Sequence, residues 1–148
     1  MSQQDKELLL RDLSARLMYN VMLHIKYYDL QGSGELDERD VELTYGNICY
    51  CIQRSHWVDF KPYLRPLSSM TEEEHNEWYN YYHGIELKEA ISSGDYLKAA
   101  ILGEVASIEW LHAYHFDCYN LIEKGLAIEV TKENNPYKRL YNKILSIE

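Results

Sequence analysis

The sequence has few cysteines and no long apolar run. Its three cysteines, Cys49, Cys51 and Cys118, are few and odd in number, so they do not make a disulfide framework. This low cysteine content favours a reducing compartment. No stretch approaches the roughly 18 apolar residues of a membrane span. The first ten residues, MSQQDKELLL, carry charges where a signal peptide needs an apolar core. The sequence therefore predicts a cytoplasmic protein that does not associate with a membrane.

Basic charge and catalytic motifs are also scarce. The chain has 15 Lys and Arg against 24 Asp and Glu, which gives a formal net charge of −9, and it has no basic stripe. Binding to a nucleic-acid phosphate backbone is therefore disfavoured. The sequence contains no glycine-rich phosphate loop, no nucleophile elbow and no acid–base pair at a familiar spacing. We expect neither enzyme activity nor a cofactor.

Tyrosine, by contrast, is abundant, with 14 residues against 3 Trp and 2 Phe. Each tyrosine brings a large apolar ring and a hydroxyl that needs a partner when it is buried. A Tyr-rich chain therefore has either a core with polar edges or a surface that binds proteins. A surface of this kind is compatible with a homodimer. With 46% hydrophobic and 26% charged residues, the composition is that of a globular protein, and the length fits one domain over residues 1–148.

The first part of the chain predicts a helix followed by a small sheet. We expect a helix over 4–17, where apolar side chains recur at helical spacing at Leu8, Leu9, Leu13 and Leu17. Alternating apolar residues predict a strand over 19–28. Glycine and serine residues predict a turn at 31–34. The segments after it predict an exposed strand at 34–45, a strand at 48–53 rich in β-branched and aromatic residues, and a candidate strand at 56–60.

The second part of the chain predicts mainly helices. Pro62 and Pro66 favour an extended segment over 61–70, and Thr71 with Glu74 forms a capping box that begins a helix ending near Gly84. The remaining expected elements are a helix at 85–94, a central helix at 96–115, a helical turn or two at 121–125 with Gly125 as C-cap, and a short strand at 126–130. The predicted fold is α+β, in which an N-terminal helix and a small antiparallel sheet (1–60) pack against three or four helices (61–148).

Two sets of residues have spacings that occur in metal sites. Asp29–Asp40 follows the spacing of a calcium loop, but a calcium loop needs a helix on each side, so a hairpin turn beside an acidic strand is the favoured interpretation. Glu109, His112 and His115 lie three residues apart on the predicted central helix, a spacing that could hold zinc or iron. A boundary role at the C-terminal end of that helix is the favoured alternative for the histidines.

Cys49 and Cys51 lie two residues apart in the predicted strand 48–53 and would share one of its faces. A C-x-C pair alone is a weak metal signal, and buried free thiols usually behave as small hydrophobes. We therefore interpret both cysteines as packing residues.

Lys61, Tyr63 and Arg65 alternate in an extended segment and so project to one side of it. Arg and Tyr are common anchors of protein interfaces, which makes these three residues a candidate interaction strip for an anionic or peptide partner. The alternative is a connector whose basic residues pair with the neighbouring acidic helix.

Three segments carry a resemblance: DLSARL (12–17), KPYLRPLSSMTEEE (61–74) and WLHAYHFDCYNLIEKGLA (110–127). They resemble a family of uncharacterised proteins of gut Bacteroides, their prophages and other mobile elements. Trp110, His115 and Asp117 match the family pattern and are candidate functional positions, whereas His112 departs from it. The resemblance implies an origin in a mobile element and supplies no activity.

The leading functional hypothesis is a non-enzymatic accessory protein of a phage or mobile element that binds another protein. One alternative is a nucleic-acid-associated regulator, in which residues 110–130 form a helix-turn-helix with a wing. Another is an acidic mimic of DNA, which requires the negative charges to lie along one ridge. The densest acidic stretches are 35–42 and 72–77.

Overall fold

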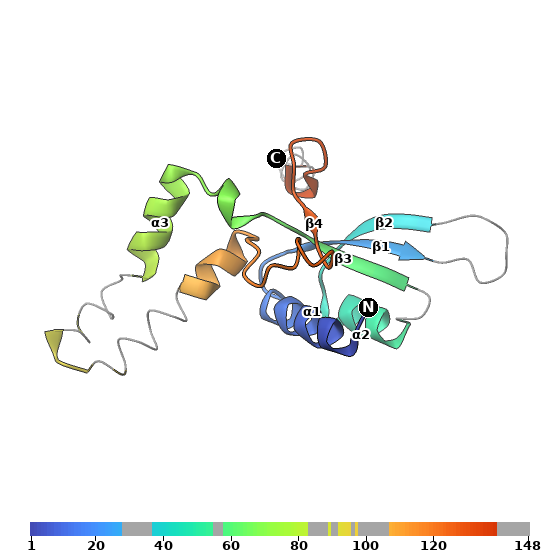
Figure 1. Cartoon of the computed structure of the whole chain (residues 1–148), viewed down its shortest axis with the longest axis horizontal. Coiled ribbons are helices and arrows are strands. Elements are labelled where there is room, and N and C mark those ends of the chain that lie inside the picture. Colours follow the sequence, from blue (N-terminus) through green and yellow to red (C-terminus); the bar gives the residue numbers. More distant parts are fainter. Residues whose placement is uncertain are drawn as a thin grey trace, which may run out of the picture.

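The computed structural model describes residues 1–27, 37–54, 58–82, 89, 92–95, 97 and 107–138, and these form an α+β fold, as the sequence predicts (Figure 1). The elements are α1 (Gln3–Ala15), β1 (Met22–Tyr27), β2 (Asp37–Glu42), α2 (Tyr45–Gln53), β3 (Val58–Leu64), the short 3₁₀ helix η1 (Leu67–Ser69), α3 (Glu72–Tyr82) and β4 (Ile128–Glu129). Residues 107–113 are also helical.

The predicted N-terminal helix is confirmed as α1. Ser2 caps it, because the Ser2 hydroxyl accepts a hydrogen bond from the Asp5 N–H at 3.0 Å while the Asp5 carboxylate accepts one from the Ser2 N–H at 3.3 Å. Leu9 and Leu13 on its apolar stripe are fully buried. They join the core formed against Leu23 of β1 and other apolar side chains of the sheet.

The sheet has the strand order β2-β1-β3-β4. β1 pairs antiparallel with β2 and with β3, so the predicted strands at 19–28 and 34–45 are confirmed, and the second lies at an exposed edge. β4 pairs parallel with β3, which makes the sheet mixed rather than purely antiparallel. A parallel neighbour needs a long connection, and residues 65–127 supply it.

The strand predicted at 48–53 is wrong, because this segment is the helix α2. The Thr44 hydroxyl accepts a hydrogen bond from the Asn47 N–H at 3.1 Å and begins the helix. Ile48 and Cys51 lie three residues apart and both face the core. Since residues two apart on a helix point to nearly opposite sides, Cys49 and Cys51 do not share a face.

The candidate strand at 56–60 is β3, which begins at Val58 and continues through Pro62 to Leu64. Part of the predicted extended segment 61–70 is therefore a strand inside the sheet. The sheet thus draws residues from both sides of position 60.

The helix predicted from the capping box is confirmed as α3. The Thr71 hydroxyl accepts from the Glu74 N–H at 3.1 Å, and the Glu74 carboxylate accepts from the Thr71 N–H at 3.2 Å. The predicted end at Gly84 lies outside the described residues, as does most of the predicted helix 85–94.

The central helix predicted at 96–115 is described mainly from 107 onward, and its C-terminal boundary is wrong. Its helical residues end at Ala113, and His115 adopts a left-handed φ of 66° that no helix continues through. Residues 121–125 form turns that end at Gly125, whose φ of 72° matches its predicted capping role.

The helices occupy two places. α1 and α2 lie on one side of the sheet, whereas α3 and residues 107–113 lie beyond one end of it (Figure 1). The Trp78 indole N–H of α3 donates to the Ser107 hydroxyl at 3.1 Å, which joins these two segments. Among the described residues, no helix has both the length and the apolar character that crossing a membrane requires.

Candidate functional site

The three segments that carry the resemblance meet around Phe116. From the first segment, Arg16 donates to both carboxylate oxygens of Asp12, at 2.7 and 2.9 Å, and to the Phe116 carbonyl at 2.6 Å. Both side chains of this ion pair are fully buried. Burial raises the pKa of Asp12 against the lowering effect of the Arg16 charge. The pair therefore ties α1 to a segment a hundred residues away.

Arg65 of the second segment flanks the same residue. Its N–H donates to the His115 carbonyl and its carbonyl accepts from the Asp117 N–H, both at 2.8 Å. Its guanidinium lies 4.2 Å from the centre of the Phe116 ring and donates to both Glu74 carboxylate oxygens at 2.7 Å. Arg65 thus pairs with the first turn of α3, as the connector alternative predicts.

Trp110 and Asp117, the matched positions of the third segment, support the local fold. Trp110 is buried and stacks with Tyr114 and with Phe116, whose ring centroids lie 4.3 and 6.0 Å from that of Trp110. The buried Asp117 carboxylate accepts from the N–H groups of Leu121 and Ile122, both at 2.9 Å. It therefore caps the turns at 121–125.

His115 stacks face to face on Tyr137, with ring centroids 4.0 Å apart. Its Nδ1 is buried and has no hydrogen-bond partner in the part of the chain that the structure describes. Burial, with the nearby charges of Arg16 and Arg65, lowers the pKa of His115 to about 4. The imidazole is therefore neutral near pH 7.

Tyr137 joins the C-terminal part of the chain to the sheet. Its hydroxyl donates to the Tyr63 carbonyl of β3 at 2.7 Å and accepts from the Met22 N–H of β1 at 3.2 Å. Burial raises the pKa of Tyr137 well above its ordinary value. This hydroxyl replaces a direct hydrogen bond between two strands at the end of their ladder.

The candidate zinc or iron set on the central helix is not assembled. Glu109 is exposed, His112 is buried, and His115 lies past the end of the helix, so these three residues do not form one ligand face. Across the described ranges, no group of three or more His, Cys, Asp or Glu side chains is placed to hold a metal ion. Most of the calcium-loop segment Asp29–Asp40 lies outside the described residues, and its last four residues belong to β2.

Lys61, Tyr63 and Arg65 lie on the polar face of the sheet. The Tyr63 hydroxyl donates to Asp40 of β2 at 2.9 Å, and the Tyr63 side chain is buried. The Asp40 carboxylate also lies 2.9 Å from Nδ1 of His24. Tyr63 and Arg65 therefore make internal contacts, while Lys61 is half-buried.

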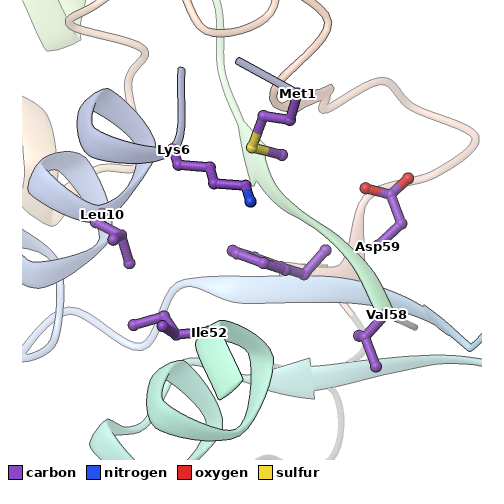
Figure 2. A pocket seen from close by; sticks show the side chains of 7 residues that line it. Met1, Lys6, Leu10, Ile52, Val58 and Asp59 are labelled. Carbon is purple, nitrogen blue, oxygen red and sulfur yellow. The ribbon is translucent and has the colours of Figure 1, made fainter. Parts of the chain in front are cut away.

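A cleft that the sequence did not predict lies between α1, α2 and β3 (Figure 2). It has a volume of about 350 Å³ and is lined by Met1, Lys6, Leu10, Ile52, Val58, Asp59 and Phe60. Lys6 extends from α1 toward β3, and Asp59 stands on the far side (Figure 2). One feature of the sequence does point to the cleft, because a lysine, Lys6, flanks the apolar stripe of the N-terminal helix. The position of Ile52 could not be predicted, because the segment 48–53 was expected to be a strand and is the helix α2.

No protein-family model, curated protein or solved structure matches this chain. The resemblance to proteins of Bacteroides and their prophages therefore stays a prediction. The residues matched by it, Trp110, His115 and Asp117, have structural roles here, whereas the cleft is a largely apolar surface that the described residues leave open.

Proposed function

We propose that this protein is a non-enzymatic interaction protein that binds a different protein through the cleft between α1, α2 and β3. The observation that carries the proposal is the combination of an apolar lining with two charged side chains, Lys6 and Asp59. Met1 is 56% exposed and Ile52 43% exposed, although both line the cleft. Neither Lys6 nor Asp59 forms an ion pair with another described residue. An apolar centre with a charged rim is the usual composition of a protein interface.

The exposure of the apolar residues favours a protein over a small molecule. Small-molecule sites enclose most of the surface of their ligand. Here two of the apolar side chains that line the cleft, Met1 and Ile52, remain exposed to solvent, so an occupant would extend beyond the cleft across the surface. From the resemblance we also expect that the protein belongs to a phage or another mobile element.

The two alternative functions have less support. A helix-turn-helix needs a second helix long enough to enter a DNA groove, and residues 121–125 form only consecutive turns. An acidic DNA mimic needs one ridge of charge, but β2 and the start of α3 lie at opposite ends of the molecule (Figure 1). Acidic residues of β2 also pair internally, as Glu38 does with Lys26 at 3.4 Å.

Photo-crosslinking tests the proposal. A photoreactive phenylalanine replaces Ile52 in the cleft or, as the control, Met18, which is 85% exposed and does not line the cleft. In cells that naturally produce the protein, we expect one discrete adduct from position 52 and none from position 18. Lys6→Glu should abolish that adduct, and Arg11→Glu, a charge reversal at an exposed position of α1 outside the cleft, should leave it intact.

Three outcomes would contradict the proposal: no adduct from position 52, an adduct that survives Lys6→Glu, or an adduct that forms equally from both positions. An adduct with twice the mass of the chain, formed by the purified protein alone, would assign the cleft to a homodimer and overturn the proposal of a different partner.

A further inference from the structure

The backbone of β3 has an open edge beside the cleft. Its direction follows from the two carbonyls at the end of the strand. The Tyr63 carbonyl accepts from the Tyr137 hydroxyl, which also accepts from β1, whereas the Leu64 carbonyl accepts from the Val130 N–H at 2.8 Å on the β4 side. Successive residues of a strand turn their backbone groups to opposite edges. The N–H and carbonyl of Phe60 therefore point away from β1, to the same edge as Leu64.

That edge is open at Phe60. β4 pairs only with Tyr63 and Leu64. The Val58 N–H donates to the Arg54 carbonyl at 3.0 Å, and Pro62 has no N–H. Within the described part of the chain, no strand pairs with the Phe60 N–H or carbonyl on this side. The missing N–H of Pro62 would point to this same edge, away from β1, so Pro62 costs the ladder between β1 and β3 no hydrogen bond.

The two edges of the sheet differ in chemistry. β2, the other edge, has the sequence DERDVE and presents exposed charged side chains, which protect an edge strand from pairing with another chain. The open edge of β3 borders the apolar cleft instead, since Val58, Asp59 and Phe60 belong to both. The arrangement offers backbone hydrogen bonds next to a hollow that accepts a side chain, which is the geometry of β-strand addition.

We infer that the partner supplies an extended segment that pairs with β3 at Phe60 and places an apolar side chain in the cleft beside Leu10 and Ile52. This inference rests on the proposed function and names what the partner presents. The Lys6 ammonium selects an acidic residue near that apolar side chain, and Asp59 on the far side selects a basic one. The ligand class is a short extended peptide with an apolar residue between opposite charges.

A displayed library of random twelve-residue linear peptides serves as the probe. Selection on the full chain should enrich peptides that alternate apolar residues with charged ones and carry at least one acidic residue. Lys6→Glu and Ile52→Ser should each weaken binding by about tenfold. Their matched controls, Arg11→Glu and Met18→Ser, should change it by less than about twofold, because neither residue lines the cleft.

Two readouts report the strand pairing itself. At saturating peptide, hydrogen exchange of the Phe60 amide should slow by about tenfold or more, because its N–H gains an acceptor. Synthetic peptides N-methylated at one backbone position at a time should lose about tenfold in affinity at every second position only, since alternate amides of an added strand face the sheet.

The results separate the inference from the function on which it rests. If the enriched peptides depend on Lys6 and Ile52 but leave Phe60 exchange unchanged and show no two-residue period, the strand pairing is wrong and cleft binding stands. If no enriched peptide depends on Lys6 and Ile52, the inference is overturned, while the cellular adduct from position 52 still decides the proposed function.

Discussion

The buried His112 and the half-buried His115 are neutral in the folded protein and so make its stability depend on pH. Burial lowers the pKa of His112 to about 4 from its ordinary 6.5, and His115 shifts to about the same value. The unfolded chain therefore binds protons between pH 6.5 and 4 that the folded protein does not bind. The stabilising contribution is present above pH 6.5 and is lost as the pH falls toward 4.

We expect the free energy of unfolding to fall between pH 7 and about pH 4.5, with His112 alone contributing about 2–3 kcal/mol of the loss. His112→Asn should reduce this pH dependence by that amount, whatever it does to stability at pH 7. Urea unfolding at several pH values measures the slope, and His75→Gln at an exposed position of α3 is the control. An unchanged slope in His112→Asn would show that His112 is not held neutral by burial.

At the scale of single residues, the sequence reveals partners that are close along the chain. Thr71 and Glu74 were predicted as a capping box because the reciprocal hydrogen bonds span only three residues. The sequence did not predict that Asp117 is a cap. Its carboxylate accepts hydrogen bonds from N–H groups of a short turn, and no regular helical pattern follows that turn in the sequence. The contacts that Arg16 and Arg65 make with residues 115–117 are not visible in the sequence, because residues so far apart along the chain share no periodic pattern.

Among the elements, α2 shows how local chemistry outweighs residue propensity. We expect Thr44→Ala to destabilise the protein by about 1 kcal/mol, because the Asn47 N–H loses its capping acceptor. Thr44→Ser keeps a hydroxyl and should be nearly neutral. Urea unfolding of the two variants measures the difference. Equal losses in both would mean that the hydroxyl does not cap this helix, since serine retains the cap but not the β-branched side chain.

The segment NICYCIQ predicts a strand because β-branched and aromatic residues are enriched in strands. Periodicity cannot distinguish helix from strand in an apolar run this short. The deciding features are the Thr44 cap and the burial of Ile48 and Cys51 at helical spacing, and burial depends on where the sheet lies. The helix α1 was predictable because its stripe is longer and its polar face is distinct.

At the scale of the whole molecule, the fold depends on contacts between residues far apart in the sequence. Arg16 reaches the Phe116 carbonyl, Tyr137 joins β1 to β3, and β4 adds to the sheet after a long connection. The class of fold was predictable from its elements. The parallel pairing of β4 and the meeting of three segments at Phe116 were not, because each depends on three-dimensional packing rather than on local pattern.

The buried pair Asp12–Arg16 tests that dependence. Arg16→Met removes the positive charge and leaves the Asp12 carboxylate buried without a partner, so we expect a loss of about 3–5 kcal/mol in the free energy of unfolding. Asp12→Leu leaves the Arg16 guanidinium buried without its carboxylate partner and should lower the free energy of unfolding by a similar amount. In the double variant neither charge is left buried, and the Phe116 carbonyl loses the hydrogen bond from Arg16, a cost of about 1–3 kcal/mol.

The double variant should therefore be more stable than either single variant, as measured by urea unfolding with an unchanged dependence on urea concentration. Gln3→Ala is the matched control on α1, because its hydrogen bond to Glu7 at 3.2 Å lies on the exposed face and its loss should cost less than about 0.5 kcal/mol. Additive losses in the double variant would mean that Asp12 and Arg16 act independently. Partial recovery would show that the tie between α1 and Phe116 depends on mutual neutralisation of two buried charges, with hydrophobic packing able to replace most of it.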